Sequence, residues 1–154
     1  MQAIGAHISA RKLLSIREKG AVAMFGTFGY ELDPLRLSKE DLEEVWTANK
    51  RFLDNHETIM EGDYYPLANP YEGNFVSWEM VDKKKENAVI FFMNYRHINW
   101  RARFLKLRGL DPNKQYRCSL DGLVHDGAYY QNIGINLSEG MPSFTPQIIE
   151  LRAA

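Results

Sequence analysis

The sequence predicts an α+β chain of two unlike parts: an alternating strand and helix part over residues 1–61 and an antiparallel β-sandwich over residues 62–154. Apolar residues recur at helical spacing in two segments before Gly62, and short apolar or alternating runs separated by turn residues follow it. The 154 residues are 45% hydrophobic and 12% aromatic, which supplies a core and suits strands. The change of pattern near Gly62 therefore divides the chain.

The first part is predicted to begin with a strand, a helix and a second strand. Ala3 to Ala10 and Phe28 to Leu32 are short apolar runs of the kind that form buried strands. Arg11 to Phe25 has apolar residues at helical spacing, although Gly20 inside it costs about 1 kcal/mol relative to alanine. With so few strands and helices this part cannot close a barrel, so we expect it to pack on the sandwich or to be the end of a longer chain.

A long amphipathic helix is predicted from about Ser38 to about Met60. Ser38 can cap its first turn, with Asp41 three residues on. Gly62 is expected to end it, because glycine adopts the left-handed conformation cheaply. Residues at three- and four-residue spacing form its apolar face: Leu42, Val45, Trp46, Asn49, Phe52 and Leu53.

The second part is predicted to be a set of short antiparallel strands. Turn residues occupy 82–87 and 111–114, and Asp121-Gly122 is a hairpin signal. In the first strand, the alternation places Val76, Trp78 and Met80 on one face, so Ser77 and Glu79 are expected on a face open to water. The expected strands are 75–81, 88–95, 104–107, 116–120, 123–130 and 148–152.

Charge and cysteine content exclude several classes of function. With 19 Lys and Arg against 20 Asp and Glu, the net charge of -1 gives no general field for nucleic acid or an anionic membrane. The single cysteine, Cys118, cannot form an internal disulfide, which favours a reducing cytoplasm. The longest apolar run, Ala88 to Met93, is far too short to span a bilayer, and we expect no export signal.

No cofactor or metal site is predicted. The histidines are scattered and lack metal-ligand spacing, Gly26 to Gly29 lacks the pattern of a phosphate-binding loop, and Cys118 lies in a strand, where a packing role is expected. Lys83 to Lys85 form a turn, and the glycosylation pattern Asn136-Leu137-Ser138 is treated as chance. The histidines are His7, His56, His97 and His125.

Two sets of residues carry candidate sugar chemistry. Glu31 and Asp33 share one face of a strand, and paired carboxylates are what a glycosidase uses, but Asp33 precedes Pro34 and can equally cap a turn. Aromatic rings crowd the start of the sandwich, where they can stack on sugars or pack in the core. These rings belong to Tyr64, Tyr65, Tyr71, Phe75 and Trp78.

Three segments resemble the C-terminal end of bacterial α-galactosidases of glycoside hydrolase family 36. They are Gly5 to Ala10, Arg17 to Asp33 with its core Gly20 to Asp33, and Leu107 to Pro112. Further segments fall in the matching order, namely Leu37-Ser38, Gly62 to Leu67 and Asn132 to Leu137. The resemblance covers nearly the whole chain, and the run from Gly20 to Asp33 carries most of it.

The resemblance implies a central (β/α)8 barrel between an N-terminal β-supersandwich and a C-terminal antiparallel β-sandwich. Residues 1–61 would be the last βα units of that barrel, and residues 62–154 the C-terminal sandwich. The family cleaves terminal α-galactosyl groups, as in melibiose and raffinose, with retention and two catalytic aspartates. Those aspartates belong to earlier barrel strands, so no residue of this sequence inherits a catalytic role, and Glu31 and Asp33 are expected to be structural.

One departure from the family concerns a loop. Family members usually continue from the His-Ile/Val-Ser-Ala segment through a Pro-Asn-His-Gln-like loop, whereas Ala10 is followed directly by Arg11-Lys12-Leu13-Leu14. A contribution of that loop to the sugar pocket is therefore not expected, and no substrate-binding residue is assigned.

Three hypotheses follow. The first is the C-terminal portion of an α-galactosidase, inactive alone, that meets α-galactosides only through the complete enzyme. The second is a free-standing carbohydrate-binding or interaction module. The third is a remnant of a split gene that docks on a separately encoded barrel, and exposed apolar surface of the first part would then favour docking or homo-oligomers.

Overall fold

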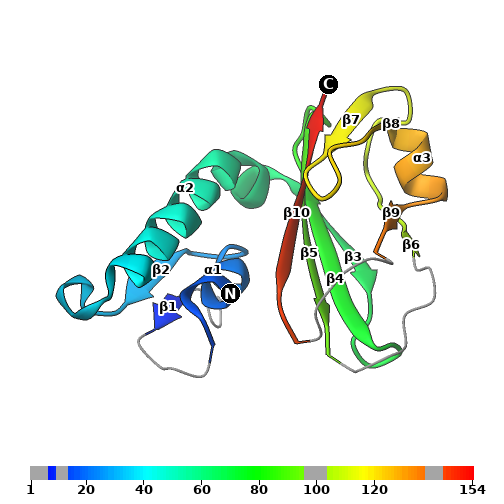
Figure 1. Ribbon diagram of the computed structural model, residues 1–154. Coiled ribbons are helices and arrows are strands. Elements are labelled where there is room, and N and C mark those ends of the chain that lie inside the picture. The colour runs from blue at the N-terminus through cyan, green and yellow to red at the C-terminus, as the bar shows by residue number, and fades with distance from the viewer. Residues whose placement is uncertain (1–6, 10–13, 96–103, 138–143) are drawn as a thin grey trace.

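The computed structural model describes residues 7–9, 14–95, 104–137 and 144–154. Its N-terminal part is a βαβ unit followed by a long helix (Figure 1). Strands β1 (His7–Ser9) and β2 (Gly29–Glu31) pair in parallel, and α1 (Ile16–Ala23) connects them. A single 3-10 turn (Pro34–Arg36) leads into α2 (Lys39–Glu61). The strand and helix order expected from the sequence is therefore present.

Side-chain caps fix where the two helices begin. Ser15 and Glu18 form a capping box on α1, which starts at Ile16; the expected start at Arg11 lies outside the described residues. At α2, the Ser38 Oγ accepts a hydrogen bond of 3.0 Å from the Asp41 backbone N–H, as the sequence indicated.

The left-handed conformation expected for Gly62 is wrong. Its φ is -72°, in extended backbone, because the chain passes straight from α2 into a strand. Glycine is still required there, since a Cβ would lie 2.2 Å from the Thr58 carbonyl oxygen and 2.7 Å from that of Val81. Close approach of backbone, rather than a positive φ, therefore explains this glycine.

The second part is a six-stranded antiparallel sheet with the order β3-β4-β5-β10-β7-β8. A two-stranded ladder of β6 and β9, together with α3, lies over one face of it (Figure 1). This second layer is therefore smaller than the second sheet expected of a sandwich. The sheet strands are β3 (Asp63–Ala68), β4 (Phe75–Val81), β5 (Asn87–Asn94), β7 (Gln115–Cys118), β8 (Val124–Asp126) and β10 (Gln147–Ala153), and the second layer contains β6 (Phe104–Leu105), β9 (Ile135–Asn136) and α3 (Gly127–Asn132).

Two elements of the second part differ from the sequence prediction. Residues 123–130 are not one strand: β8 ends at Asp126, whose carboxylate accepts a 2.7 Å hydrogen bond from the Tyr129 N–H and so starts α3. Strand β3 was not predicted, because its Pro66 and largely exposed side chains lack the alternation of a half-buried strand. Its position at the edge of the sheet tolerates both features.

The expected exposure of one face of β4 is also wrong. Ser77 and Glu79 are 1% and 0% exposed, because the second layer covers their face of the sheet. The Ser77 hydroxyl donates a 2.6 Å hydrogen bond to the Phe91 carbonyl, and Glu79 accepts one from the Arg108 N–H. These hydrogen bonds compensate in part for burying polar groups.

The helices of the first part cover the opposite face of the sheet (Figure 1). There the Trp78 ring stacks on Phe91 with 4.1 Å between centroids, and Phe25 from the chain after α1 meets Trp78 edge-on at 5.6 Å. Met24 and Ile59 are buried in the same cluster. Both faces of the sheet are thus covered. No helix among the described residues combines the length and apolar character needed to cross a membrane.

Candidate functional site

The carboxyl ends of the parallel strands hold the carboxylate pair singled out in the sequence. Ser9 and Glu31 are in register there, and Glu31 is exposed. Asp33 has a structural role, because its Oδ1 accepts a 3.0 Å hydrogen bond from the Leu35 N–H and its Oδ2 lies 3.2 Å from the Arg36 Nε. Asp33 thus caps the 3-10 turn, as its position before Pro34 allowed.

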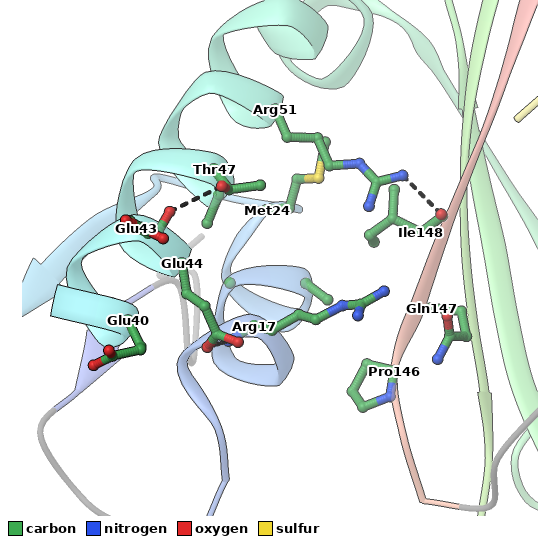
Figure 2. Close-up of a pocket in the computed structure, with 13 residues that line it drawn as sticks. Arg17, Met24, Glu40, Glu43, Glu44, Thr47, Arg51, Pro146, Gln147 and Ile148 are labelled. Carbon is green, nitrogen blue, oxygen red and sulfur yellow. Dashed lines mark hydrogen bonds between the residues drawn. The ribbon is translucent and has the colours of Figure 1, made fainter. Parts of the chain in front are cut away.

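The groove between the two parts of the molecule has a volume of about 520 Å³ (Figure 2). Helices α1 and α2 form one wall, and the start of β10 forms the other. Gly20 lets α1 approach α2 closely, because a Cβ on it would lie 2.8 Å from the Cβ of Ala48. The lining side chains include Arg17, Met24, Glu40, Glu43, Glu44, Thr47, Arg51, Pro146, Gln147 and Ile148.

Two charged side chains in this groove, Glu44 and Arg51, connect neighbouring elements. The Glu44 Oε2 accepts a 3.1 Å hydrogen bond from the Arg17 backbone N–H and so fixes the first turn of α1. The Arg51 Nε lies 2.5 Å from the Glu150 Oε1, and its Nη2 donates to the Ile148 carbonyl at 2.8 Å, which Figure 2 shows. Because the Arg51 side chain binds Glu150 and Ile148 of β10, the groove is a contact region between α2 and the sheet, which we call the joint.

The joint continues into a polar cleft of about 820 Å³ beside the sheet. Asn55 is 1% exposed, donates to the Arg51 carbonyl at 2.7 Å and accepts from the Arg152 Nη2 at 2.6 Å. Arg152 also donates to Asn87 at 3.1 Å. Sequence reasoning missed this network because α2 and β10 are far apart in the chain, although the polar Asn55 on the apolar face of a helix is a signal for it.

The structure separates the five aromatic residues singled out in the sequence. Tyr64 and Trp78 line a shallow groove of about 280 Å³ together with Phe25 and Met60. Tyr65 and Phe75 pack against the main core instead, and Tyr71 is 96% exposed. Because Phe91 stacks on Trp78, one face of the Trp78 ring is used in packing.

The described residues show no arrangement of side chains suited to metal binding or nucleophilic catalysis. These residues contain no group of three His, Cys, Asp or Glu side chains that could hold a metal ion. His56 packs edge-on against Phe52 at 5.4 Å, His125 stacks on Tyr129 at 3.9 Å, and His97 lies outside the described residues. Burial raises the pKa of the Cys118 thiol, which leaves less of the reactive thiolate.

The remaining motifs have structural positions. Gly26 borders the aromatic groove, and Lys83 forms an ion pair with Asp63 next to the turn between β4 and β5. Asn136 pairs with Phe104 in the β6–β9 ladder. Ser138 of the glycosylation pattern and the segment that follows Ala10 lie outside the described residues.

Comparisons with known proteins give one family. The Glycosyl hydrolase family 36 C-terminal domain matches residues 75–151. The bifunctional α-galactosidase/sucrose kinase AgaSK of Mediterraneibacter gnavus is 30% identical over 96% of this chain and 16% of its own length. For the α-galactosidase AgaA of Geobacillus stearothermophilus the identity is 30%, over 99% of this chain and 22% of its own length. The chain therefore spans about a fifth of these curated relatives.

Solved structures agree. The galactosidase domain of AgaSK superposes with a TM-score of 0.88 at 28% identity, covering 99% of this chain and 22% of that one. The family 36 α-galactosidase AgaB of Geobacillus stearothermophilus gives 0.89 at 29% identity, covering 97% and 22%. Variants of AgaA from the same organism were crystallised with stachyose and with raffinose.

Proposed function

Because the chain belongs to glycoside hydrolase family 36, we propose that it acts as the C-terminal portion of an α-galactosidase that removes terminal α-galactosyl groups with retention. One observation carries the proposal: 97–99% of the chain superposes on only 22% of family 36 α-galactosidases. The carboxylate pair singled out in the sequence has no assigned catalytic role, since Asp33 is used as a cap. We infer that the chain alone is inactive. Its cytoplasmic location remains a prediction from the sequence.

The proposal includes a role for each part. Residues 1–61 supply the last βα units of a barrel, and residues 62–154 form the C-terminal domain. In support, β1, α1 and β2 form a parallel βαβ unit, and its two strands pair over three positions among the described residues. A single pair of parallel strands needs neighbouring strands to bury it, because parallel sheets are stable when both faces are covered.

Helix α2 presents the surface that such neighbours would cover. Trp46, Leu53 and Met60 follow at seven-residue intervals, so they share one side of the helix, and they are 64%, 63% and 46% exposed. This side points roughly away from Ala48, where α1 packs. Isolated exposed apolar residues are ordinary, but a stripe along one helix indicates a contact surface. We propose that the remainder of the barrel docks there.

Complementation tests the proposal. AgaA of Geobacillus stearothermophilus, shortened by the portion that matches this chain, is co-produced with this chain, and hydrolysis of an aryl α-galactoside and of raffinose is measured. We expect neither fragment alone to hydrolyse either substrate and the pair to do so. Turnover by the 154-residue chain alone would contradict the proposal.

The docking surface has matched variants. Trp46→Glu with Leu53→Glu should lower the restored activity at least tenfold, because two charges would have to be buried against apolar surface. Lys106→Ala, an exposed change beside β6 on the face of the sheet opposite α2, should leave it unchanged. Equal activities for both variants would remove the α2 stripe from the proposal.

Saturable quenching of tryptophan fluorescence by raffinose in the chain alone would instead favour a free-standing binding module using the Tyr64 and Trp78 groove.

A further inference from the structure

Glu79 is a carboxylic acid placed inside the main core. Its side chain is 0% exposed, in the middle of β4, on the face of the sheet that the second layer covers. One oxygen, Oε1, accepts a hydrogen bond from the Arg108 backbone N–H. The other, Oε2, is buried and has no hydrogen-bond partner within the part of the chain that the structure describes. A buried polar atom without a partner is rare enough in folded proteins to require an explanation.

The surroundings of Glu79 offer little to hold a negative charge. In register on either side lie Tyr65 of β3 and Ile90 of β5, and the neighbours on its own face of β4 are Ser77 and Val81. Among the described residues, the cation that acts on the carboxyl is Arg108, whose side chain is exposed. An ionised carboxylate with one oxygen unpaired in this site is far more costly than a neutral acid.

The segment that contains Arg108 passes over the sheet in close contact with it. We call residues 104–110 the crossing segment. Gly109 has a φ of +73°, and a Cβ on it would lie 2.4 Å from the Tyr65 ring, so the segment lies directly on β3. The hydrogen bond from the Arg108 N–H joins the segment to Glu79 of β4. Its outer side is joined to the second layer, because the Leu107 N–H donates to the Tyr130 carbonyl at 3.0 Å. Glu79 therefore joins the sheet to the layer that covers it.

We propose that Glu79 is a pH-operated latch: its neutral carboxyl group holds the crossing segment on the sheet, and loss of its proton to alkaline solvent loosens that segment. The latch concerns the fold of the C-terminal part and is independent of the proposed hydrolytic function. In agreement with the geometry, burial raises the pKa of Glu79 to about 8, while the Arg108 N–H and the Arg108 charge lower it and offset only part of that effect.

The direction of the effect on stability follows from proton linkage. Folded chains keep the proton of Glu79 up to a pH of about 8, whereas unfolded chains lose it near the ordinary glutamate pKa of 4.5. Its contribution is therefore fully present below that ordinary pKa and declines as the pH rises to about 8. Over this window the folding equilibrium constant should fall roughly tenfold per pH unit relative to a chain without the titrating group.

The test compares the 154-residue chain with Glu79→Gln across this pH range. Glutamine keeps the shape and an oxygen that can accept from the Arg108 N–H, but it cannot ionise. We expect denaturant unfolding to show the tenfold decline per pH unit only in the unaltered chain, and Glu57→Gln, an exposed change on α2, to retain it. Parallel pH profiles for the unaltered chain and Glu79→Gln would overturn the proposal.

Two further measurements do not depend on how well the variant folds. In the infrared spectrum of the unaltered chain, a protonated carboxyl band should persist at neutral pH and disappear with a midpoint near 8. Hydrogen exchange of peptides covering the crossing segment, corrected for the intrinsic pH dependence, should rise over the same interval. Absence of the neutral-pH band, or exchange that stays constant through the midpoint, would overturn the latch.

Discussion

The two parts of the molecule complete their cores in different ways. The sheet part, residues 63–153, encloses a continuous cluster built from five of its strands and its second layer, with side chains such as Tyr116, Leu151 and Ile90 at 0% exposure. Residues 7–61 enclose only the small cluster around Ile8, Ile16 and Ala23. The first part buries its remaining apolar side chains against the sheet, in the cluster around Met24 and Ile59. It therefore depends on neighbours, whereas the sheet part is largely self-contained.

The joint between the two parts has an apolar half and a polar half. Trp78, Phe25 and Phe91 form its apolar half. Arg51 and Glu150 with their partners form the polar half. Apolar burial supplies attraction without direction, whereas the hydrogen bonds of Arg51 fix how α2 lies on the sheet. Mutations in the two parts and at the joint should therefore lower the free energy of unfolding by different amounts.

The largest effect is expected inside the sheet part. Gly134→Ala should lower the free energy of unfolding by about 4 kcal/mol, because φ is +102° and a Cβ would lie 2.4 Å from the Leu105 carbonyl oxygen, which cannot move without breaking the β6–β9 ladder. Gly122→Ala, at φ +73° in open space, should cost about 1 kcal/mol. Urea denaturation of both variants measures the difference, and equal losses would mean that the second layer is not closely packed.

A smaller effect is expected where α1 meets α2. Gly20→Ala should lower the free energy of unfolding by about 2 kcal/mol, although alanine is the better helix former, because its Cβ would lie 2.8 Å from that of Ala48. Adding Ala48→Gly should recover most of the loss, which thermal unfolding of the single and double variants measures. A stabilising Gly20→Ala would show that the two helices are not held together in the chain by itself.

The smallest effect is expected at the polar half of the joint. Arg51→Ala removes hydrogen bonds to Glu150 and Ile148 and should cost about 1.5 kcal/mol, since Arg51 is partly exposed and Arg152 remains 3.7 Å from Glu150. Lys50→Ala, which removes an exposed pair with Asp54, should change stability by less than about 0.5 kcal/mol. Denaturant unfolding of both variants compares them. If the two losses match, the joint is held by its apolar half alone.

Local signals in the sequence predicted most elements of both parts. Ser38 marked the start of α2, the alternating run at 75–81 marked β4, and Asp121-Gly122 marked the turn between β7 and β8. Each of these signals acts within a few residues, through a cap, a period of two or a turn. The errors had local causes as well: Asp126 begins a helix where apolar residues suggested a continued strand, and Pro66 concealed the edge strand β3.

The candidate site was harder to predict than the fold. Asp33 was correctly considered as a cap, and the aromatic set indicated Tyr64 and Trp78, which do meet in one groove. The network of Arg51, Asn55 and Glu150 could not be foreseen, because its partners come from α2 and β10, which are separated by 95 and 99 residues at these contacts. Spacing along the chain carries no information on such pairs.

The sequence by itself determined the family, the change from helix to strands near Gly62 and the elements whose signals are local. Only the tertiary structure decided that both faces of β4 are covered, because alternation defines two faces but not which of them distant elements will cover. It also decided the role of Gly20, whose cost within α1 is offset by close approach to Ala48. Glu79 is the clearest case: the same carboxylate is ordinary on an open strand and becomes a buried acid once the second layer covers it and the Arg108 N–H binds it.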